Sequence, residues 1–388
     1  MTGQSQQTPA SPLDTLNTVS SVAERSSERK EKAARLAALM NELHLDAVLF
    51  QRNENIAWAT AGQVETVVAI PAETGVASLL LTRTGQKYYL TTNNEAARLA
   101  DEEFAGLDYE PVIAPWYHGN ALELARKKSG VNRIGTDLPL DGFPHVYISP
   151  LRSPLTNAEI ARFRWLAQNT AGATAEVLLE LEPGITEEEM SGLVAQRLLS
   201  RSILPSVLLT AVDDRIRKYK HAVSRGRILE RYGMLNLCAR KWGLAVSITR
   251  FVYFGKPPQE LVDSFAACAE INARLLHASR SGATAADLYA FAERAYRETG
   301  FPGEEKLHHQ GGPAGYLERE WVATPHGKQK IAEVQGLAWN PSLRGAKAED
   351  TALLKDGRIE ILTKTPSLPI IDVAVDGLSY PAANMLVR

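Results

Sequence analysis

The residues best suited to acid–base chemistry are three histidines and two glutamates in the second half of the chain. His221 lies in YKHAVSRGRIL, and His308 and His309 open the segment HHQGGPAGYLERE. An imidazole has a reference pKa near 6.5, so it can accept and release a proton at neutral pH. A carboxylate can bind a cationic group or polarise an amide. Candidates for such acid–base chemistry are His221, His309, Glu320 and Glu349.

A second set of polar side chains could bind a small substrate. Asparagine offers both a donor and an acceptor, and arginine can hold a carboxylate with two parallel hydrogen bonds. The run Gly311-Gly312-Pro313 would let the backbone approach a bound molecule closely. Each feature also has a purely structural interpretation, such as a glycine-rich turn, a core histidine or an ion pair between Arg250 and Glu349. The predicted binding residues of this part of the chain are Asn236, Ser247, Asn340, Arg319, His308 and Arg250.

The elements that would position these residues form two similar halves. The segment NLCARKWGLAVSITR predicts a hairpin over residues 236–250, with a tight turn that ends in Gly243. PGITEEEM and SGATAADL share Gly-x-Thr-x-x-acid, which is typical of a helix start with Thr186 or Thr284 as the capping residue. Strand-rich sequence follows each copy. This pattern predicts a duplicated α+β domain, although two unrelated capped helices would look the same.

The preceding part of the chain predicts a polar tail and a smaller domain. Residues 1–28 are mostly polar and are expected to be a disordered tail. Strand and helix patterns alternate over residues 29–152, which predicts an α/β domain. Breaker and cap signals at Ser153-Pro154 and Asn157 place the boundary at residues 152 and 153, before a long helix that begins around Ala158. Residues 153–388 would then form the larger domain.

Composition narrows the classes of function. The 388 residues are 45% hydrophobic, and the net charge is −2, which gives no electrostatic support for a nucleic-acid partner. No run of eighteen apolar residues predicts a membrane span, and the N-terminus lacks the pattern of a signal peptide. Cys238 and Cys268 lie in apolar surroundings, so we expect buried thiols in a reducing cytoplasm and no disulfide.

These segments resemble the pita-bread family, which includes aminopeptidase P, prolidase, methionine aminopeptidase and creatinase. In the family hairpin, Ala239, Gly243, Thr249 and Arg250 match, and His221 falls on a substrate-facing histidine. The resemblance implies an α+β protein: a C-terminal pita-bread domain, which is a duplicated α+β domain, and a smaller N-terminal α/β creatinase-like domain. The positions of the family's five metal ligands correspond here to Asn236, Ser247, Gly312, Asn340 and Glu349.

Only one of these five positions keeps a family ligand, Glu349. Two bridged divalent metals need several anionic oxygens, and an amide and a hydroxyl are neutral. His308 and His309 are adjacent, and adjacent strand residues point to opposite faces, so both could bind one metal only from a loop. We therefore expect no metal and no other cofactor.

Within the family, creatinase hydrolyses a C–N bond without a metal, through a histidine and carboxylates. The resemblance thus implies a metal-independent, cytoplasmic hydrolase or related lyase that acts on a small amide, amidine or guanidine, with His221 as acid and base. One alternative is an Xaa-Pro metallopeptidase with atypical ligands, and another is a non-catalytic binding protein on the same fold. The resemblance also implies a small-molecule substrate and a homodimer in which the N-terminal domain lies near the partner's active site. In the segment QRNENIAWATAG, Arg52 and Trp58 are candidates for such contacts, and a surface patch is the alternative.

Overall fold

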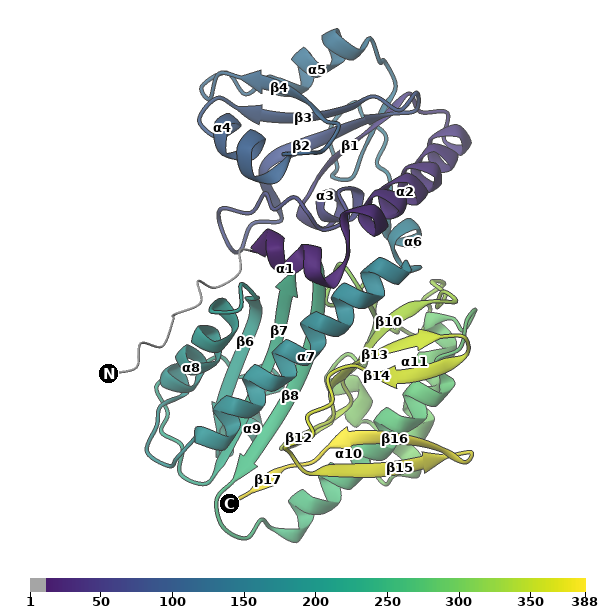
Figure 1. Cartoon of the computed structure of the whole chain (residues 1–388). Helices are drawn as coiled ribbons and strands as arrows, with labels where there is room; N and C mark the ends of the chain where they lie inside the picture. The colour runs from purple at the N-terminus through teal and green to yellow at the C-terminus, as the bar shows by residue number, and fades with distance from the viewer. Residues whose placement is uncertain (1–11) are drawn as a thin grey trace, which may run out of the picture. The chain divides into compact units, whose positions relative to one another are not determined.

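The computed structural model describes residues 12–388, which fold into two compact units (Figure 1). The first unit runs to residue 148 and also includes residues 157–162, and the second contains residues 149–156 and 163–388. The chain therefore passes between the units several times around the boundary predicted at residues 152 and 153. No helix among the described residues is long and apolar enough to cross a membrane.

The first unit is built on one mixed five-stranded sheet with the order β4-β3-β2-β1-β5. Strands β1 and β5 pair in parallel, as do β3 and β4, whereas β2 is antiparallel to both of its neighbours. Apolar side chains of the sheet pack with Ala125 of α5. The main elements are α2 (Val22–Glu42), β1 (Ala47–Arg52), α3 (Asn53–Ala59), β2 (Thr74–Thr82), β3 (Lys87–Thr92), β4 (Glu110–Ala114), α5 (Ala121–Ser129) and β5 (Ile134–Thr136).

The expected disordered tail is wrong for residues 12–28, and residues 1–11 lie outside the described residues. Helix α1 covers Pro12–Val19, and α2 begins with a capping box between Ser21 and Glu24. The polar residues of α2 are not all solvated: Glu28 and Lys32 are buried and form an ion pair, and Arg162 binds Glu28 at 2.7 Å. The partners that stabilise this polar helix are therefore supplied by a segment far away in the sequence.

The second unit contains two four-stranded sheets, each accompanied by helices (Figure 1). One has the order β17-β8-β7-β6 and the other β14-β13-β10-β9, and adjacent strands are antiparallel except that β17 runs parallel to β8. The elements of the first half are α7 (Asn157–Glu180), α8 (Glu187–Leu199), β6 (Leu204–Val212), α9 (Asp214–Lys218), β7 (Tyr232–Lys241) and β8 (Leu244–Tyr253). Those of the second are α10 (Gln259–Ala278), α11 (Ala285–Glu298), β9 (Gly311–Ala314), β10 (Gln335–Trp339), β13 (Asp350–Lys355) and β14 (Arg358–Ile361). Short elements complete the unit: α6 (Ser149–Arg152), the 3-10 helix Glu304–Leu307, β11 (Ser342–Leu343), β12 (Ala346–Lys347), β15 (Ile370–Val375), β16 (Leu378–Ala383) and β17 (Leu386–Val387).

The two halves repeat a local motif as well as an architecture. Both predicted capping boxes are confirmed, with Thr186 capping α8 and Thr284 capping α11. Each capping threonine also forms an isolated antiparallel bridge, to Ile228 in the first half and to Lys330 in the second. A shared bridge of this kind has no role in helix capping itself. It therefore supports duplication over two unrelated capped helices, and the predicted α+β fold class is confirmed.

Replacing Thr186 with alanine should lower the free energy of unfolding by about 1 kcal/mol, the usual effect of losing an N-cap side chain. The threonine hydroxyl accepts from the Glu189 amide at 3.2 Å and donates to the Glu189 carboxylate at 2.8 Å. Thr186→Ser keeps this hydroxyl and is the matched control. Urea unfolding of both variants measures the effect, and equal stability of Thr186→Ala and the native chain would contradict the capping role.

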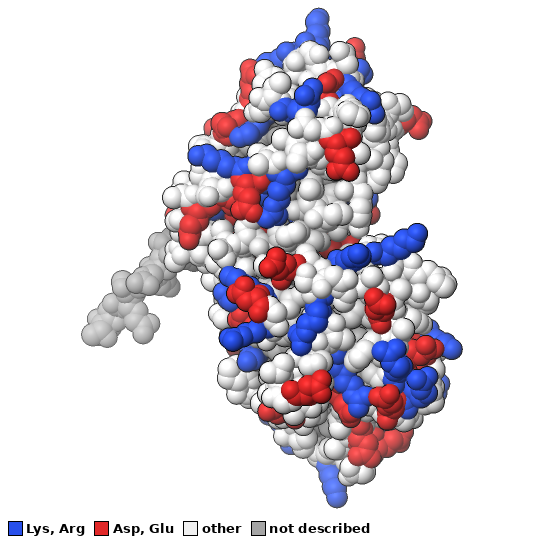
Figure 2. All heavy atoms as spheres, turned by 90° about the vertical axis from the view of Figure 1, so that its right-hand side faces the viewer, with Lys and Arg blue, Asp and Glu red and all other residues white. Residues whose placement is uncertain are grey.

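Charged side chains of both signs are distributed over the surface. On the face shown in Figure 2, Lys and Arg side chains lie among Asp and Glu side chains. This agrees with the totals in the sequence, which has 43 basic and 45 acidic residues.

Candidate functional site

The β7–β8 hairpin brings four polar side chains onto one face of its sheet. Its turn residues Trp242 and Gly243 have φ values of 54° and 77°, as a type I′ turn requires. The resulting register pairs Asn236 with Thr249 and Cys238 with Ser247. Because alternate strand residues share a face, all four side chains point to the same side of the sheet. The predicted hairpin over residues 236–250 is confirmed.

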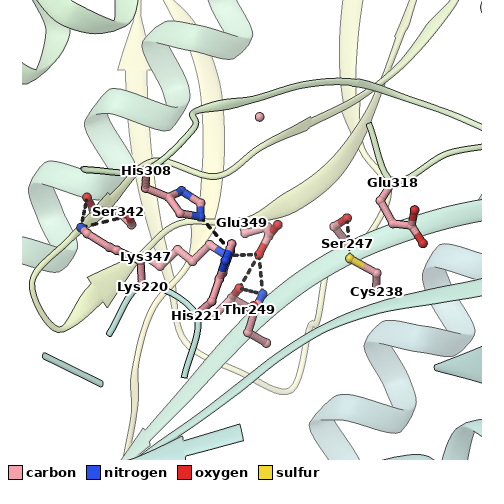
Figure 3. A network of polar contacts seen from close by, with 12 residues as sticks. Lys220, His221, Cys238, Ser247, Thr249, His308, Glu318, Ser342, Lys347 and Glu349 are labelled. Carbon is pink, nitrogen blue, oxygen red and sulfur yellow. Dashed lines mark hydrogen bonds and ion pairs between the residues drawn. The ribbon is translucent and has the colours of Figure 1, made fainter. Parts of the chain in front are cut away.

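Glu349 lies where the two sheets of the second unit meet. Its backbone carbonyl accepts from the Thr249 amide of β8 at 3.2 Å. One carboxylate oxygen accepts from Asn236 Nδ2 at 2.7 Å and from the Thr249 hydroxyl at 2.6 Å (Figure 3). The Ser247 hydroxyl accepts from Arg319 at 2.8 Å. Asn236 therefore faces the Glu349 carboxylate, and Ser247 faces a partner of that carboxylate.

Two cations bind the Glu349 carboxylate directly. Lys347 Nζ lies 2.7 Å from one oxygen and Arg319 Nη2 lies 2.8 Å from the other. The side chains of Lys347, Arg319 and Glu349 are 8%, 11% and 3% exposed, so these are largely buried ion pairs. Burial alone would raise the pKa of Glu349, but the two cations and the hydrogen bonds outweigh it and hold the pKa at about 2.

Lys347 is not among the site residues predicted from the sequence. A signal was present, because Lys347 and Glu349 are two residues apart in an extended segment and therefore point to the same side. With Lys347 added, the cluster holds two basic side chains and one carboxylate. The result is a polar centre with an excess of positive charge.

These residues do not fit the two divalent metals that the family implies. Glu349 is the only anion at the five ligand positions, and its charge is already balanced by Lys347 and Arg319. At Gly312, a Cβ atom would lie 2.2 Å from the backbone oxygen of Trp321, so a histidine there would collide with the main chain. Two fixed cations would also repel the metals. The donor set therefore lacks both the charge and, at one position, the space for the family's metal centre.

Three histidines from two loops lie close together in the same unit. His221 follows α9, and Lys220 anchors its loop by donating to the Ser342 carbonyl at 3.0 Å (Figure 3). His308 Nε2 is 3.0 Å from His221 Nε2, and the rings of His308 and His309 stack with centroids 4.3 Å apart. The structure thus places together three of the residues that the sequence singled out.

The two adjacent histidines point the same way because they lie in a loop before β9. The carbonyl of His308 accepts from the side chain of Gln310 at 2.6 Å, and the Tyr296 hydroxyl donates to the same side chain at 2.8 Å. Gly311 has a φ of 90°, a conformation that favours glycine. A buried glutamine and a left-handed glycine therefore hold this loop in shape.

The pKa values of all three imidazoles lie below the ordinary 6.5. For His221 and His308 the first cause is desolvation, and the nearby charge of Lys347 adds to it. Desolvation also comes first for His309, followed by Arg319 and Lys347. The imidazoles are therefore neutral at pH 7, which is the form that can accept a proton.

Besides His308 Nδ1, two polar atoms of the predicted binding residues are buried without a hydrogen-bond partner among the described residues. They are Asn340 Oδ1, an acceptor, and Arg319 Nε, a donor. Extending the β10–β13 register by one residue places Asn340 opposite Glu349, the residue that Arg319 binds. Leaving a polar atom buried and unpaired costs about 1–3 kcal/mol, so both atoms are suited to a polar ligand.

Glu320 and Arg250 need correction, because their charged groups are already paired inside the fold. Glu320 binds the guanidinium of Arg152 at 2.8 Å and accepts from Ser149 at 2.9 Å. Arg250 pairs with Asp350 at 2.7 Å, and it touches Glu349 only at the backbone carbonyl. These contacts make both residues ion-pair partners within the second unit, and neither has a free charged group for a substrate.

Trp58 also needs correction, because it belongs to the core of the first unit. Its side chain is 1% exposed, and Lys32 lies over its ring at 5.4 Å. Arg52 is 31% exposed and pairs with Glu73 at 3.2 Å. Of the two residues, only Arg52 is accessible enough for the predicted contact.

Both cysteines of the chain are free thiols. Cys268 is buried and Cys238 is half-buried, with its sulfur 3.2 Å from the Ser247 hydroxyl. Burial raises the pKa of each thiol to about 12. Neither thiol is therefore ionised at pH 7, so neither is an activated nucleophile.

Comparisons with known families agree with this two-unit architecture. Residues 161–355 match the model of metallopeptidase family M24, and residues 32–161 match the model of the creatinase/prolidase N-terminal domain. The chain belongs to metallopeptidase family M24. Together the two matches confirm the predicted pita-bread family.

Solved structures similar to this family member include peptidases of low sequence identity. An Xaa-Pro dipeptidase from Bacillus anthracis has a TM-score of 0.70 and 17% identity, and the match covers 93% of this chain and 100% of that one. An X-Pro aminopeptidase from Thermotoga maritima has a TM-score of 0.70 and 18% identity, and the match covers 92% of this chain and 99% of that one. The dipeptidase PepE from Mycobacterium ulcerans has a TM-score of 0.71 and 15% identity, and the match covers 93% of this chain and 98% of that one. No curated protein matches the chain. Similarity at these identities supports the fold alone.

Proposed function

We propose that this M24 family member is a metal-independent hydrolase of a C–N bond in a small amide, amidine or guanidine-type substrate. The observation that carries the proposal is the ion-pair cluster in which Lys347 and Arg319 bind Glu349, the one family ligand that remains. Metal chemistry at that centre would need anionic oxygens that these positions do not offer.

His221 is the proposed acid and base. It is exposed, and its pKa lies below the ordinary value, so a neutral imidazole faces solvent at pH 7. In the proposed step a water oxygen bonds to the substrate carbon while His221 takes the water proton. The C–N bond then breaks, and the same proton passes to the leaving nitrogen. The proton is conserved, so the step requires no further reactant.

The unpaired atoms near the cluster suggest how the substrate is held. An amide or amidine has both a donor and an acceptor, and Asn340 Oδ1 and Arg319 Nε offer the complementary pair. Glu349 has a different role from the one that its sequence position suggested. Because four side chains already donate to it, it orients Lys347 and Arg319 and does not act as a free base.

The test is a substrate screen with the full chain after exhaustive dialysis against EDTA. We expect release of ammonia or amine from a member of a panel of small amides, amidines and guanidines, with a rate that added Mn²⁺ or Co²⁺ does not increase. Mass spectrometry of the products distinguishes hydrolysis from elimination by the uptake of one water.

Membership of a metallopeptidase family favours a second candidate, an Xaa-Pro peptidase with atypical metal ligands. The same preparation should therefore be given Xaa-Pro dipeptides with and without Mn²⁺ and Co²⁺. Cleavage of these dipeptides only when a metal is added would overturn the proposal of a metal-independent hydrolase.

A further inference from the structure

The three histidines form the one cluster of metal-ligating residues among the described residues. One ligand atom from each of His221, His308 and His309 lies within 4.8 Å of the other two. They are distinct from the five positions of the family's metal centre, none of which carries a histidine here. The three histidines therefore form a possible metal site that is separate from the family's metal centre.

That geometry is close to the geometry of a three-histidine site. With Zn–N bonds of about 2.0–2.1 Å, two ligand nitrogens of a tetrahedral zinc lie about 3.3 Å apart. The Nε2 atoms of His221 and His308 are 3.0 Å apart, and the His221 and His309 ring centroids are 6.2 Å apart. The ligand atom of the exposed His309 lies within 4.8 Å of the other two, so this side chain has to rotate to bring a nitrogen to the distance of a third ligand.

A second observation concerns His308. Its Nδ1 atom is buried and has no hydrogen-bond partner among the described residues, and its Nε2 atom meets only another imidazole. Buried polar atoms are nearly always satisfied in folded proteins. One nitrogen of this ring therefore lacks the protein partner that a purely structural histidine would have.

We propose that His221, His308 and His309 together bind one divalent transition-metal ion of the Zn²⁺ or Co²⁺ type. Imidazole nitrogen suits these ions, and three protein ligands leave a fourth position for water. The site differs from the sequence-based expectation that the protein binds no metal.

The charged residues beside the three histidines affect how tightly a metal ion would bind. Lys347 and Arg319 share one carboxylate, Glu349, so the region next to the histidines keeps a net positive charge. Binding should thus be weaker than at a structural zinc site, in which thiolates supply negative charge. The inference goes beyond the proposed hydrolysis, but a bound ion would occupy His221 and so inhibit it.

The test titrates the EDTA-treated full chain with Co²⁺ and follows the visible absorption of four-coordinate cobalt. We expect a saturable spectrum with one ion per chain, which Zn²⁺ abolishes by displacement. His308→Ala and His309→Gln should each weaken binding at least about tenfold, the smallest loss seen even for outer partners of a ligand. Circular dichroism confirms that each variant is folded.

Two matched variants control for other ligands. His326→Ala removes an exposed histidine of the same unit, and Cys238→Ala removes the half-buried thiol. Both should bind Co²⁺ with native affinity. A native chain that gives no saturable spectrum, histidine variants that bind normally, or loss of binding in Cys238→Ala would each overturn the inference. Because the readout is a spectrum, none of these results would affect the proposed acid–base role of His221.

Discussion

Replacing Glu349 with glutamine is expected to lower the free energy of unfolding of the second unit by about 3–5 kcal/mol at pH 7. Glutamine keeps the shape of the side chain but removes its charge. Lys347 and Arg319, which are 8% and 11% exposed, would then be buried cations without a counter-charge. The measurement is urea unfolding followed by near-ultraviolet circular dichroism.

The difference in the free energy of unfolding between the native chain and Glu349→Gln should also depend on pH below about pH 4.5. The pKa of Glu349 is lowered from 4.5 to about 2 by folding. A lowered pKa contributes stability above the unfolded value, and this contribution is lost as the pH falls toward the folded value. At about 1.4 kcal/mol per pH unit, the difference should shrink by about 2 kcal/mol between pH 4.5 and pH 3.

Two further variants separate charge pairing from other causes. Glu360 is 47% exposed and forms an ion pair with Arg164, which is 43% exposed. Glu360→Gln breaks this exposed ion pair and should change the free energy of unfolding by less than about 1 kcal/mol. Adding Lys347→Met to Glu349→Gln removes one stranded cation and should recover part of the loss. A constant difference from pH 5 to pH 3 would contradict the proposed pairing.

The parts of the fold that the sequence predicted correctly depend on local signals. The β7–β8 hairpin follows from a tight turn at Gly243, and the two helix starts follow from Thr186 and Thr284 with an acid three residues later. Ser21 and Glu24 carry the same capping signal at the start of α2, although the polar composition suggested disorder. In that case a local signal was correct and the composition was misleading.

The roles of single charged residues could not be predicted because they depend on distant partners. Glu320 is paired with Arg152, which lies 168 residues earlier, and Arg250 with Asp350, which lies 100 residues later. The sequence predicts substrate contacts for both, with an ion pair to Glu349 as the alternative for Arg250, and it does not indicate the partner that either residue has. Lys347 was missed for the opposite reason. It lies at no position of the family motifs quoted above, although it binds the Glu349 carboxylate.

Replacing His221 with alanine is expected to lower kcat about 10²- to 10⁴-fold on the compound that the screen returns, the usual contribution of a general acid or base. This loss corresponds to about 3–5 kcal/mol in the activation free energy. Stability should change little, because His221 is exposed and hydrogen-bonds to His308 through its Nε2 atom.

Chemical rescue distinguishes proton transfer from a structural role. Because His221 is exposed, added imidazole can reach the space that His221→Ala leaves, and it should restore part of kcat without changing the native enzyme. His326→Ala, which removes another exposed histidine of the same unit, should keep full activity with or without imidazole. Native kcat in His221→Ala would exclude the residue as acid and base. A large loss of kcat that imidazole does not reverse would instead make His221 a residue that positions the substrate.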